Sequence, residues 1–330
     1  MKRREFIALF GGAAAAPLAF PYSASAQQPA MPVVGYLQSR SAAGASHLMA
    51  AFREGLQDSG FIDGQNVRIE FRWGDGHFDR MPALAKELAA IPVAVLAATG
   101  GEPVVMSAKA AASTIPLVFA MSGDPIKLGL ATSFNRPGRN ATGVNILTTA
   151  LEPKRLGLLR ELAPLATTLA AFVHAHLPQI EGQVNDLQQA AAQTGVKLHL
   201  FRISTERDID AAFETIAREK MGALAVAGSP FFDTHHTNII ALAARHAVPA
   251  SYHFREYVES GGLMSYGIDI RDAHRQVGRY AGQILKGAKA GDMPIMLPSK
   301  FEFVINLKTA KALNLTISPT VLARADEVIE

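Results

Sequence analysis

Short apolar runs alternate with amphipathic stretches along most of this chain, and this alternation constrains its fold more than any other feature. Val33–Leu37 is the first apolar run, and apolar residues recur at helical spacing in the stretch Ser46–Ser59 that follows. The runs Val93–Ala97 and Ile115–Phe119 are apolar throughout, which is typical of strands buried on both faces of a parallel sheet. Repeated βα units of this kind predict an α/β fold with helices covering parallel sheets.

The alternating pattern runs through the chain twice. The first run ends at a strand predicted over Thr142–Ile146, and the second extends from a helix over Glu152–Leu162 to a strand over Ala250–Tyr252. A long helix over Arg271–Lys286 and a strand over Phe301–Ile305 follow. The chain has 330 residues, 49% of them hydrophobic, which is enough for two cores of ordinary size. We therefore predict two doubly wound parallel-sheet lobes rather than one wide sheet.

Residues 1–26 have the pattern of an export signal. The basic segment Lys2-Arg3-Arg4 precedes a weakly apolar Ala/Gly stretch, and Ala24-Ser25-Ala26 is a small-residue cleavage site. The twin arginine resembles the signal of the twin-arginine route. Pro17 and Pro21 interrupt the apolar stretch, which disfavours a membrane anchor because a span needs roughly 20 apolar residues. We expect a cleaved, periplasmic protein.

The composition excludes several classes of site. The chain has no cysteine, so disulfides, thiolate metal sites, cysteine nucleophiles and a lipid-anchored cysteine are absent. Three basic and one acidic side chain leave with the signal, so the formal net charge falls from +3 to +1, which gives no indication of nucleic-acid binding. The spacing of His174 with His176, and of His235 with His236, does not suit a metal site.

Sequence motifs for cofactor binding and catalysis are also missing. The first strand is not followed by Gly-x-Gly-x-x-Gly, and the chain has neither a Gly-Lys-Ser/Thr phosphate loop nor a Gly-x-Ser-x-Gly nucleophile elbow. Its carboxylates are scattered rather than paired. We expect no cofactor, no metal and no enzymatic activity.

Three strands are followed by a proline next to residues that cap helices. The segments are Thr99-Gly100-Gly101-Glu102-Pro103, Ser122-Gly123-Asp124-Pro125 and Gly228-Ser229-Pro230. One interpretation is that they are only well-capped helix starts. The other is that helix N-termini from both lobes face one cleft at the carboxyl ends of the strands and bind a carboxylate there. Three such segments favour the second interpretation.

Motifs spread over the whole chain after the signal resemble those of the ABC-transporter substrate-binding family that includes tryptophan- and tyrosine-type binding proteins. They are Ile115–Phe119, Asp124-Pro125, Gly129-Leu130, Pro137-Gly138, Asn140, Thr142-Gly143, Gly261–Asp269, Arg275–Gly278, Ile284–Gly287 and Phe301–Glu330. The resemblance implies a type I periplasmic-binding-protein fold. It also implies that a monomer captures a small carboxylate-bearing ligand, such as an amino acid, for a membrane permease and its ATPase.

The resemblance also implies where the lobes and the ligand contacts lie. Lobe 1 would hold residues 33–144 plus about 270–295, and lobe 2 residues 145–269 plus about 296–330. The ligand-binding residues that it implies are Ser39, Thr99, Gly100, Ser122, Asp124, Ser229, Tyr252 and Asp269, and we expect His176, at a position that departs from the family pattern, to bind ligand as well. Hydroxyls and amides near Thr99 and Ser122 would bind a carboxylate, Asp124 or Asp269 an ammonium group, and Tyr252 would offer a stacking face.

Two segments depart from the family pattern. Ala175-His176-Leu177-Pro178-Gln179 stands where relatives carry Asn-Pro, and Glu102–Val105 is bulkier than the small residues common there. The ligand therefore need not be an aromatic amino acid. A sensor for a membrane signalling protein and, less favoured, a periplasmic α/β enzyme are the alternative functions.

Overall fold

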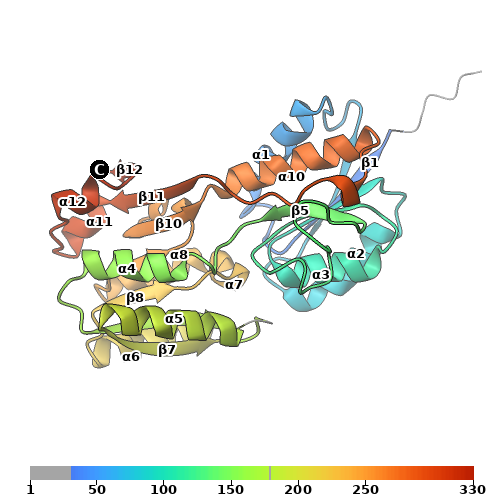
Figure 1. Ribbon diagram of the computed structural model, residues 1–330. Helices are drawn as coiled ribbons and strands as arrows, with labels where there is room; N and C mark the ends of the chain where they lie inside the picture. The colour runs from blue at the N-terminus through green and yellow to red at the C-terminus, as the bar shows by residue number, and fades with distance from the viewer. Residues whose placement is uncertain (1–30, 178–179) are drawn as a thin grey trace, which may run out of the picture. The chain divides into compact units, whose positions relative to one another are not determined.

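A computed structural model describes residues 31–177 and 180–330 of the chain. The predicted signal over residues 1–26 lies outside the described residues, and so do Pro178 and Gln179. Residues 31–330 form one compact unit that contains two β-sheets (Figure 1).

The first sheet has five parallel strands in the order β2-β1-β3-β4-β5. Its strands are β1 (Val33–Gln38), β2 (Arg68–Trp73), β3 (Val95–Thr99), β4 (Leu117–Met121) and β5 (Ala141–Asn145). Its helices are α1 (Ser46–Asp58), η1 (Phe78–Arg80), α2 (Met81–Ala89) and α3 (Glu102–Ala111). Every residue of β1, β3, β4 and β5 is buried, as expected of parallel strands covered on both faces.

The second sheet has seven strands in the order β12-β11-β10-β9-β8-β6-β7. Its strands are β6 (Thr168–His174), β7 (Lys197–Ile203), β8 (Ala223–Val226), β9 (Ala250–Tyr252), β10 (Met264–Ile268), β11 (Phe301–Asn306) and β12 (Glu327–Ile329). The helices with it are α4 (Glu152–Leu162), α5 (Ile180–Thr194), α6 (Glu206–Arg218), α7 (Pro230–Thr234), α8 (His236–Arg245), α9 (Arg255–Glu259), α11 (Leu307–Ala312) and α12 (Pro319–Leu322).

Strand β11 is antiparallel to β10, whereas the other paired strands of this sheet are parallel. After β10 the chain leaves the second sheet and forms α10 (Ile270–Leu285), which packs with α1, β3, β4 and β5 of the first. It then passes through η2 (Ala290–Asp292) and along β5, where the Met296 N–H donates to the Gly143 carbonyl at 2.9 Å. Because the chain re-enters the second sheet from this side, β11 runs opposite to β10. The two-sheet, doubly wound α/β fold predicted from the sequence is confirmed.

Helices α1 and α10 lie side by side (Figure 1) and approach closely through glycines. A Cβ atom at Gly55 would lie 1.8 Å from the Arg275 carbonyl oxygen, and one at Gly278 would lie 2.1 Å from that of Phe52. Both distances are far below any tolerated contact, so only glycine permits this packing. The contact fixes α10 from the late part of the chain onto the first sheet.

Candidate functional site

A cavity of about 280 Å³ lies where the carboxyl ends of strands from both sheets meet. The volume is at the lower end of the range of roughly 300–1,000 Å³ for small-molecule sites. The first-sheet wall consists of segments that follow β1, β3 and β4, and the second-sheet wall of α5 and the segments that follow β8 and β9. Carboxyl ends of parallel strands are where open α/β sheets bind ligands.

The wall after β1 is held by a buried hydrogen-bond network around Gln38. Its Nε2 donates to Thr99 Oγ1 at 2.9 Å, and its Oε1 accepts from the Ser39 backbone N–H at 2.8 Å. The Thr99 hydroxyl in turn donates to the Tyr36 hydroxyl at 3.0 Å. Burial raises the pKa of Tyr36 to about 12, so its hydroxyl stays protonated. The polar groups of Ser39 and Thr99 are therefore hydrogen-bonded to other residues within the wall.

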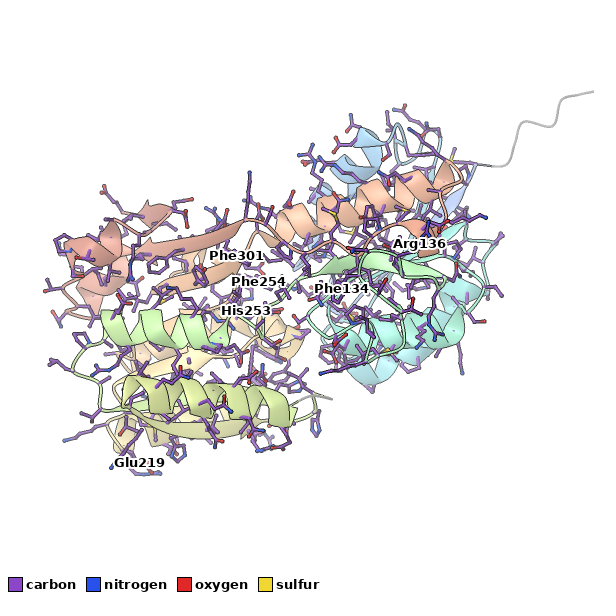
Figure 2. All side chains as sticks on the ribbon, in the orientation of Figure 1. Phe134, Arg136, Glu219, His253, Phe254 and Phe301 are labelled. Carbon is purple, nitrogen blue, oxygen red and sulfur yellow. The ribbon has the colours of Figure 1, made fainter. Side chains whose placement is uncertain are left out.

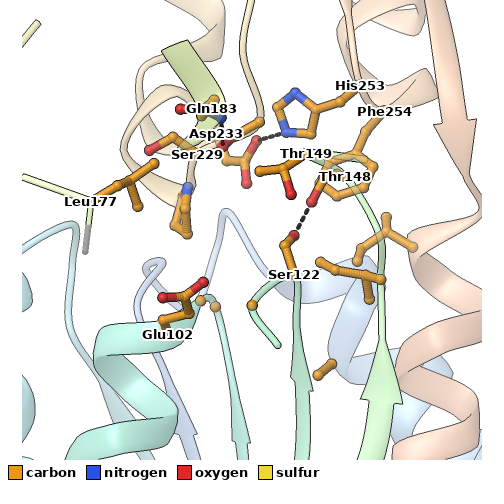
Figure 3. Close-up of a pocket in the computed structure, with 18 of the residues that line it drawn as sticks. Glu102, Ser122, Thr148, Thr149, Leu177, Gln183, Ser229, Asp233, His253 and Phe254 are labelled. Carbon is orange, nitrogen blue, oxygen red and sulfur yellow. Dashed lines mark hydrogen bonds and ion pairs between the residues drawn. The ribbon is translucent and has the colours of Figure 1, made fainter. Parts of the chain in front are cut away.

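Glu102, the first residue of α3, presents its carboxylate to the cavity from the first-sheet wall (Figure 3). Two glycines with positive φ, Gly100 at 98° and Gly101 at 105°, make the sharp turn between β3 and this helix. Gly101 is the N-cap and has no side chain to bond the helix amides. The N-terminus of α3 thus faces the cavity, and its first residue, Glu102, places a carboxylate there.

The wall from α5 carries Gln183 and Asp186, three residues apart on one helix face. Gln183 is buried, and its Nε2 donates to Glu152 Oε1 at 2.7 Å. That oxygen also accepts from the Gly228 N–H at 2.9 Å and lies 3.5 Å from Arg155 Nη2. Burial raises the pKa of Glu152 to about 7, although Arg155 opposes the rise. Glu152 therefore fixes both Gln183 and the loop that leads to Ser229.

Hydroxyl groups line the space between these walls. Ser122 Oγ, after β4, is hydrogen-bonded to Thr148 Oγ1 from the segment that leaves β5, and Thr149 lies beside it (Figure 3). Phe254 follows β9 (Ala250–Tyr252) by two residues and adds an aromatic ring to the lining; Figure 2 labels it next to His253. A ligand would meet hydroxyls on one side and an apolar ring on another.

An ion-pair network around Arg40 forms a further part of the cavity wall. Arg40, after β1, donates to both oxygens of Glu256 at 3.0 and 2.8 Å and lies 3.3 Å from Asp233 Oδ2. Asp233 Oδ1 also accepts from His253 Nε2 at 2.8 Å and from the Tyr257 hydroxyl at 3.0 Å. Burial by itself would raise the pKa of Asp233, but His253 and Arg40 hold it below its ordinary value. Arg40 is thus fully engaged with carboxylates of the protein.

His274 of α10 lies against the same wall and is 3% exposed. Its Nδ1 is 2.9 Å from the Ile270 carbonyl oxygen, which can only accept, so Nδ1 carries the proton. Burial lowers the pKa of His274 to about 4, so the ring is neutral and Nε2 is a bare acceptor. Nε2 has no hydrogen-bond partner among the described residues.

Of the nine residues predicted to bind ligand, Gly100, Ser122 and Ser229 line the cavity. Ser39 and Thr99 lie directly behind the lining, where Ser39 Oγ donates to the Gly100 carbonyl at 2.9 Å. The ligand contacts of these residues remain predictions.

The structure places the other four away from the cavity lining. Asp124 accepts from the Ile126 N–H at 2.8 Å, and His176 is exposed at the end of the segment after β6. Tyr252 is fully buried and stacks on Tyr257 at 4.7 Å, so its ring is used in the core. Asp269 caps α10 by accepting from the Arg271 N–H at 2.9 Å. Asp124 and Asp269 thus bond to local backbone and Tyr252 packs in the core, whereas His176 is exposed outside the lining, contrary to the ligand contacts that we expected.

Two of the three expected helix starts also differ from the prediction. Ser122–Pro125 leads into turns rather than a helix, because Leu130 N–H bonds back to the Pro125 carbonyl and Gly129 adopts a positive φ of 68°. At α3 the helix forms but Thr99 does not cap it. Only Ser229 caps as expected, by accepting from the Phe231 N–H at 3.2 Å at the start of the short helix α7.

The sequence interpretation missed most of the charged lining. Arg40 and His253 follow strands and could have been found by the rule that identified Ser122. Gln183, Asp186 and His274 lie within helices, and the face that each helix turns to the cavity depends on packing. No group of three or more potential metal ligands occurs among residues 31–177 and 180–330. Within those same ranges, no helix is both long and apolar enough to span a membrane.

Comparison with known proteins identifies the family. A family described as ABC transporter substrate binding protein matches residues 37–329. A tyrosine-binding protein of Clostridioides difficile (strain R20291) is 25% identical over 264 residues, which are 80% of this chain and 75% of that protein.

Solved structures agree with this match. An ABC domain from Streptococcus pneumonia in complex with L-Trp is 26% identical, covers 90% of this chain and 99% of its own, and has a TM-score of 0.81. A conserved domain protein from Vibrio cholerae, 24% identical with the same two coverages and a TM-score of 0.82, shares the fold. The chain belongs to the family of ABC transporter substrate-binding proteins.

Proposed function

We propose that this protein captures a small solute in the cavity between its two sheets and delivers it to an ABC permease and its ATPase in the inner membrane. The observation that supports this proposal is the cavity, because strand ends of both sheets and helix α10 contribute to one lining. A ligand there touches both halves of the fold at once. The ligand would therefore favour the conformation in which both walls contact it. The size of this shift depends on how much more tightly the ligand binds that conformation than one in which only one wall contacts it.

An amino acid or a related compound is the ligand class that we propose. The cavity volume of about 280 Å³ suits a molecule of that size, and Phe254 and Leu177 provide apolar lining. The relatives support this class, since one is named a tyrosine-binding protein and another was solved with L-Trp. Ser122, Thr148 and Thr149 provide hydroxyls for the polar groups of such a ligand.

We also propose that the protein binds without catalysing a reaction, as a monomer in the periplasm that is exported by its N-terminal signal and carries no lipid anchor. His253 is directed by Asp233, but the serines of the lining are engaged elsewhere: Ser122 bonds Thr148, and Ser229 caps α7. Among the described residues of the lining, no serine hydroxyl is hydrogen-bonded to a histidine, the pair of nucleophile and base on which acyl-transfer chemistry of this kind depends.

A thermal-shift screen of residues 27–330 against amino acids, aromatic acids, amines and short carboxylates tests the proposal. A true ligand at a hundredfold excess over its Kd stabilises the fold by about 2.7 kcal/mol. The Ser229→Phe variant fills the cavity and is expected to abolish that shift, whereas Gln193→Phe on the exposed face of α5 is expected to preserve it. A shift that survives Ser229→Phe would show that the ligand binds elsewhere.

A further inference from the structure

The Glu102 carboxylate lacks a partner within the part of the chain that the structure describes. Its Oε2 is buried and accepts no hydrogen bond there, and none of the ion pairs of those residues involves Glu102. Burial accordingly raises the pKa of Glu102, with no neighbouring cation to oppose the rise. A buried acceptor without a partner is unfavourable, and for a carboxylate the penalty is larger than for a neutral group.

The surrounding backbone makes room for this carboxylate at the cavity. Gly123 lies against it, and a Cβ atom at that position would be 2.2 Å from Glu102 Oε1. The α3 N-terminus favours the ionised form through its dipole. The carboxylate is therefore accommodated at the wall, yet neither hydrogen-bonded nor neutralised by the described residues.

Three further residues of the same lining, Gln183, His253 and His274, carry a buried side-chain atom without a hydrogen-bond partner in the described chain. Gln183 is 5% exposed, and while its Nε2 donates to Glu152, its Oε1 accepts nothing. Nε2 of the neutral His274 is likewise free to accept. The unsatisfied groups of Glu102, Gln183 and His274 are all acceptors, which favours a ligand rich in donors. His253, whose Nε2 is bonded to Asp233, leaves its Nδ1 without a partner as well.

Arg40, the buried cation of the lining, is not free to bind a carboxylate of the ligand. Arg40 is already paired with Glu256 and Asp233, at 2.8 and 3.3 Å. Lys127 of the lining is exposed, and so is Asp186, another acidic residue of the lining. At the α3 N-terminus, where we expected helix amides to bind a ligand carboxylate, the charge of Glu102 would repel one.

We propose that Glu102 is the specificity-determining residue of the cavity and that the ligand presents a positively charged nitrogen group, an ammonium or amidinium, to its carboxylate. The ligand class is then an organic amine of amino-acid size, in which a carboxyl group is not required. This inference rests on the proposed function, because it assumes that the cavity binds the transported solute.

Two matched sets of ligands distinguish the contribution of the ligand's amine from that of its carboxylate. Calorimetric titrations of residues 27–330 would compare tyrosine with tyramine, which lacks the carboxylate, and with 3-(4-hydroxyphenyl)propionate, which lacks the amine. The series of tryptophan, tryptamine and indole-3-propionate repeats the comparison on a larger ring. We expect the amine of at least one series to bind, and the acid of that series to bind at least about tenfold more weakly or not at all.

The Glu102→Gln variant keeps the shape of the side chain and removes its charge. We expect it to weaken binding of the amine at least about tenfold while its Tm stays equal to or above that of the wild type, since an uncompensated buried charge is removed. Glu87→Gln is the matched control, because Glu87 is an exposed residue of α2 that pairs with Arg72 at 2.7 Å. It is expected to leave binding unchanged.

Three results would overturn the inference. Binding of an acid but not of its matching amine would reverse the charge preference, and an unchanged amine affinity in Glu102→Gln would remove Glu102 from the site; both leave the proposed function standing. If neither the six compounds nor any amino acid or amine of the thermal-shift screen binds, the proposed amino-acid-related ligand class fails, and this inference fails with it.

Discussion

Gly123 leaves the space that the carboxylate of Glu102 occupies: a Cβ atom at Gly123 would lie 2.2 Å from Glu102 Oε1. Residue 123 therefore controls the position of the only carboxylate on the first-sheet wall of the cavity among the described residues. We expect Gly123→Ala to displace the Glu102 side chain and to weaken binding of an amine ligand by roughly tenfold.

The fold should tolerate this change, because the displaced atom is the end of a flexible side chain. We expect Gly123→Ala to lower the free energy of unfolding by less than about 1 kcal/mol in chemical denaturation. Calorimetric affinity measured alongside denaturation checks both parts. An affinity equal to that of the wild type would mean that the Glu102 position does not matter for binding.

The contact between α1 and α10 gives a prediction about stability. Gly55→Ala places a Cβ atom 1.8 Å from the Arg275 carbonyl oxygen, so the two helices must separate. We expect a loss of at least about 2 kcal/mol in the free energy of unfolding. Gly157→Ala within α4 is the matched control, because that Cβ meets nothing within 4 Å, and it is expected to gain about 0.5–1 kcal/mol from helix propensity. Equal effects of the two changes in urea denaturation would contradict the packing described.

Removal of Arg40 should destabilise the protein strongly. Arg40→Met leaves Glu256 and Asp233 buried without the guanidinium, and breaking such a pair costs about 3–5 kcal/mol. Arg80→Met, which removes an exposed ion pair to Asp75, is expected to change stability by less than about 1 kcal/mol. Denaturant midpoints of the two variants give the comparison, and an Arg40→Met protein as stable as Arg80→Met would show that Arg40 is not paired as described.

His274 makes stability depend on pH. Burial lowers its pKa to about 4 from an ordinary value near 6.5, so the unfolded chain takes up the proton first as the pH falls. The contribution of His274 to folding is complete above pH 6.5 and is lost between about pH 6.5 and 4, by up to about 3 kcal/mol.

His274→Asn removes the titrating ring, while its side-chain amide can still donate to the Ile270 carbonyl. We expect the variant to show a shallower fall in the free energy of unfolding over this pH range. Denaturation curves at half-unit pH steps measure it. Parallel pH profiles of wild type and variant would mean that the ring is accessible to protons in the folded protein.

Much of the fold could be predicted from the sequence, because buried parallel strands are apolar and helices are amphipathic. The predicted helix Glu152–Leu162 and strand Ala250–Tyr252 have the bounds that the structure shows. Strand ends are less well determined. We predicted a strand from Ile115, but β4 begins at Leu117, since Pro116 has no N–H to donate to a neighbouring strand.

Residues of the site could be predicted only where they come directly after a strand. Ser122 and Ser229 lie just after strands and line the cavity as that rule predicts. Gln183 was missed because its orientation depends on how α5 packs and on a bond to Glu152, 31 residues away. Tyr252 was misplaced because a tyrosine at the end of a strand can face either the cleft or the core, and here it stacks on Tyr257.

Equilibrium dialysis of residues 27–330 against the best compound of the thermal-shift screen, followed by chemical analysis of the ligand recovered, tests the central claim most directly. We expect one molecule bound per chain and recovered unchanged, with binding lost in Ser229→Phe and retained in Gln193→Phe. Recovery of a converted product, or equal binding by the two variants, would contradict a binding protein that holds its ligand in this cavity.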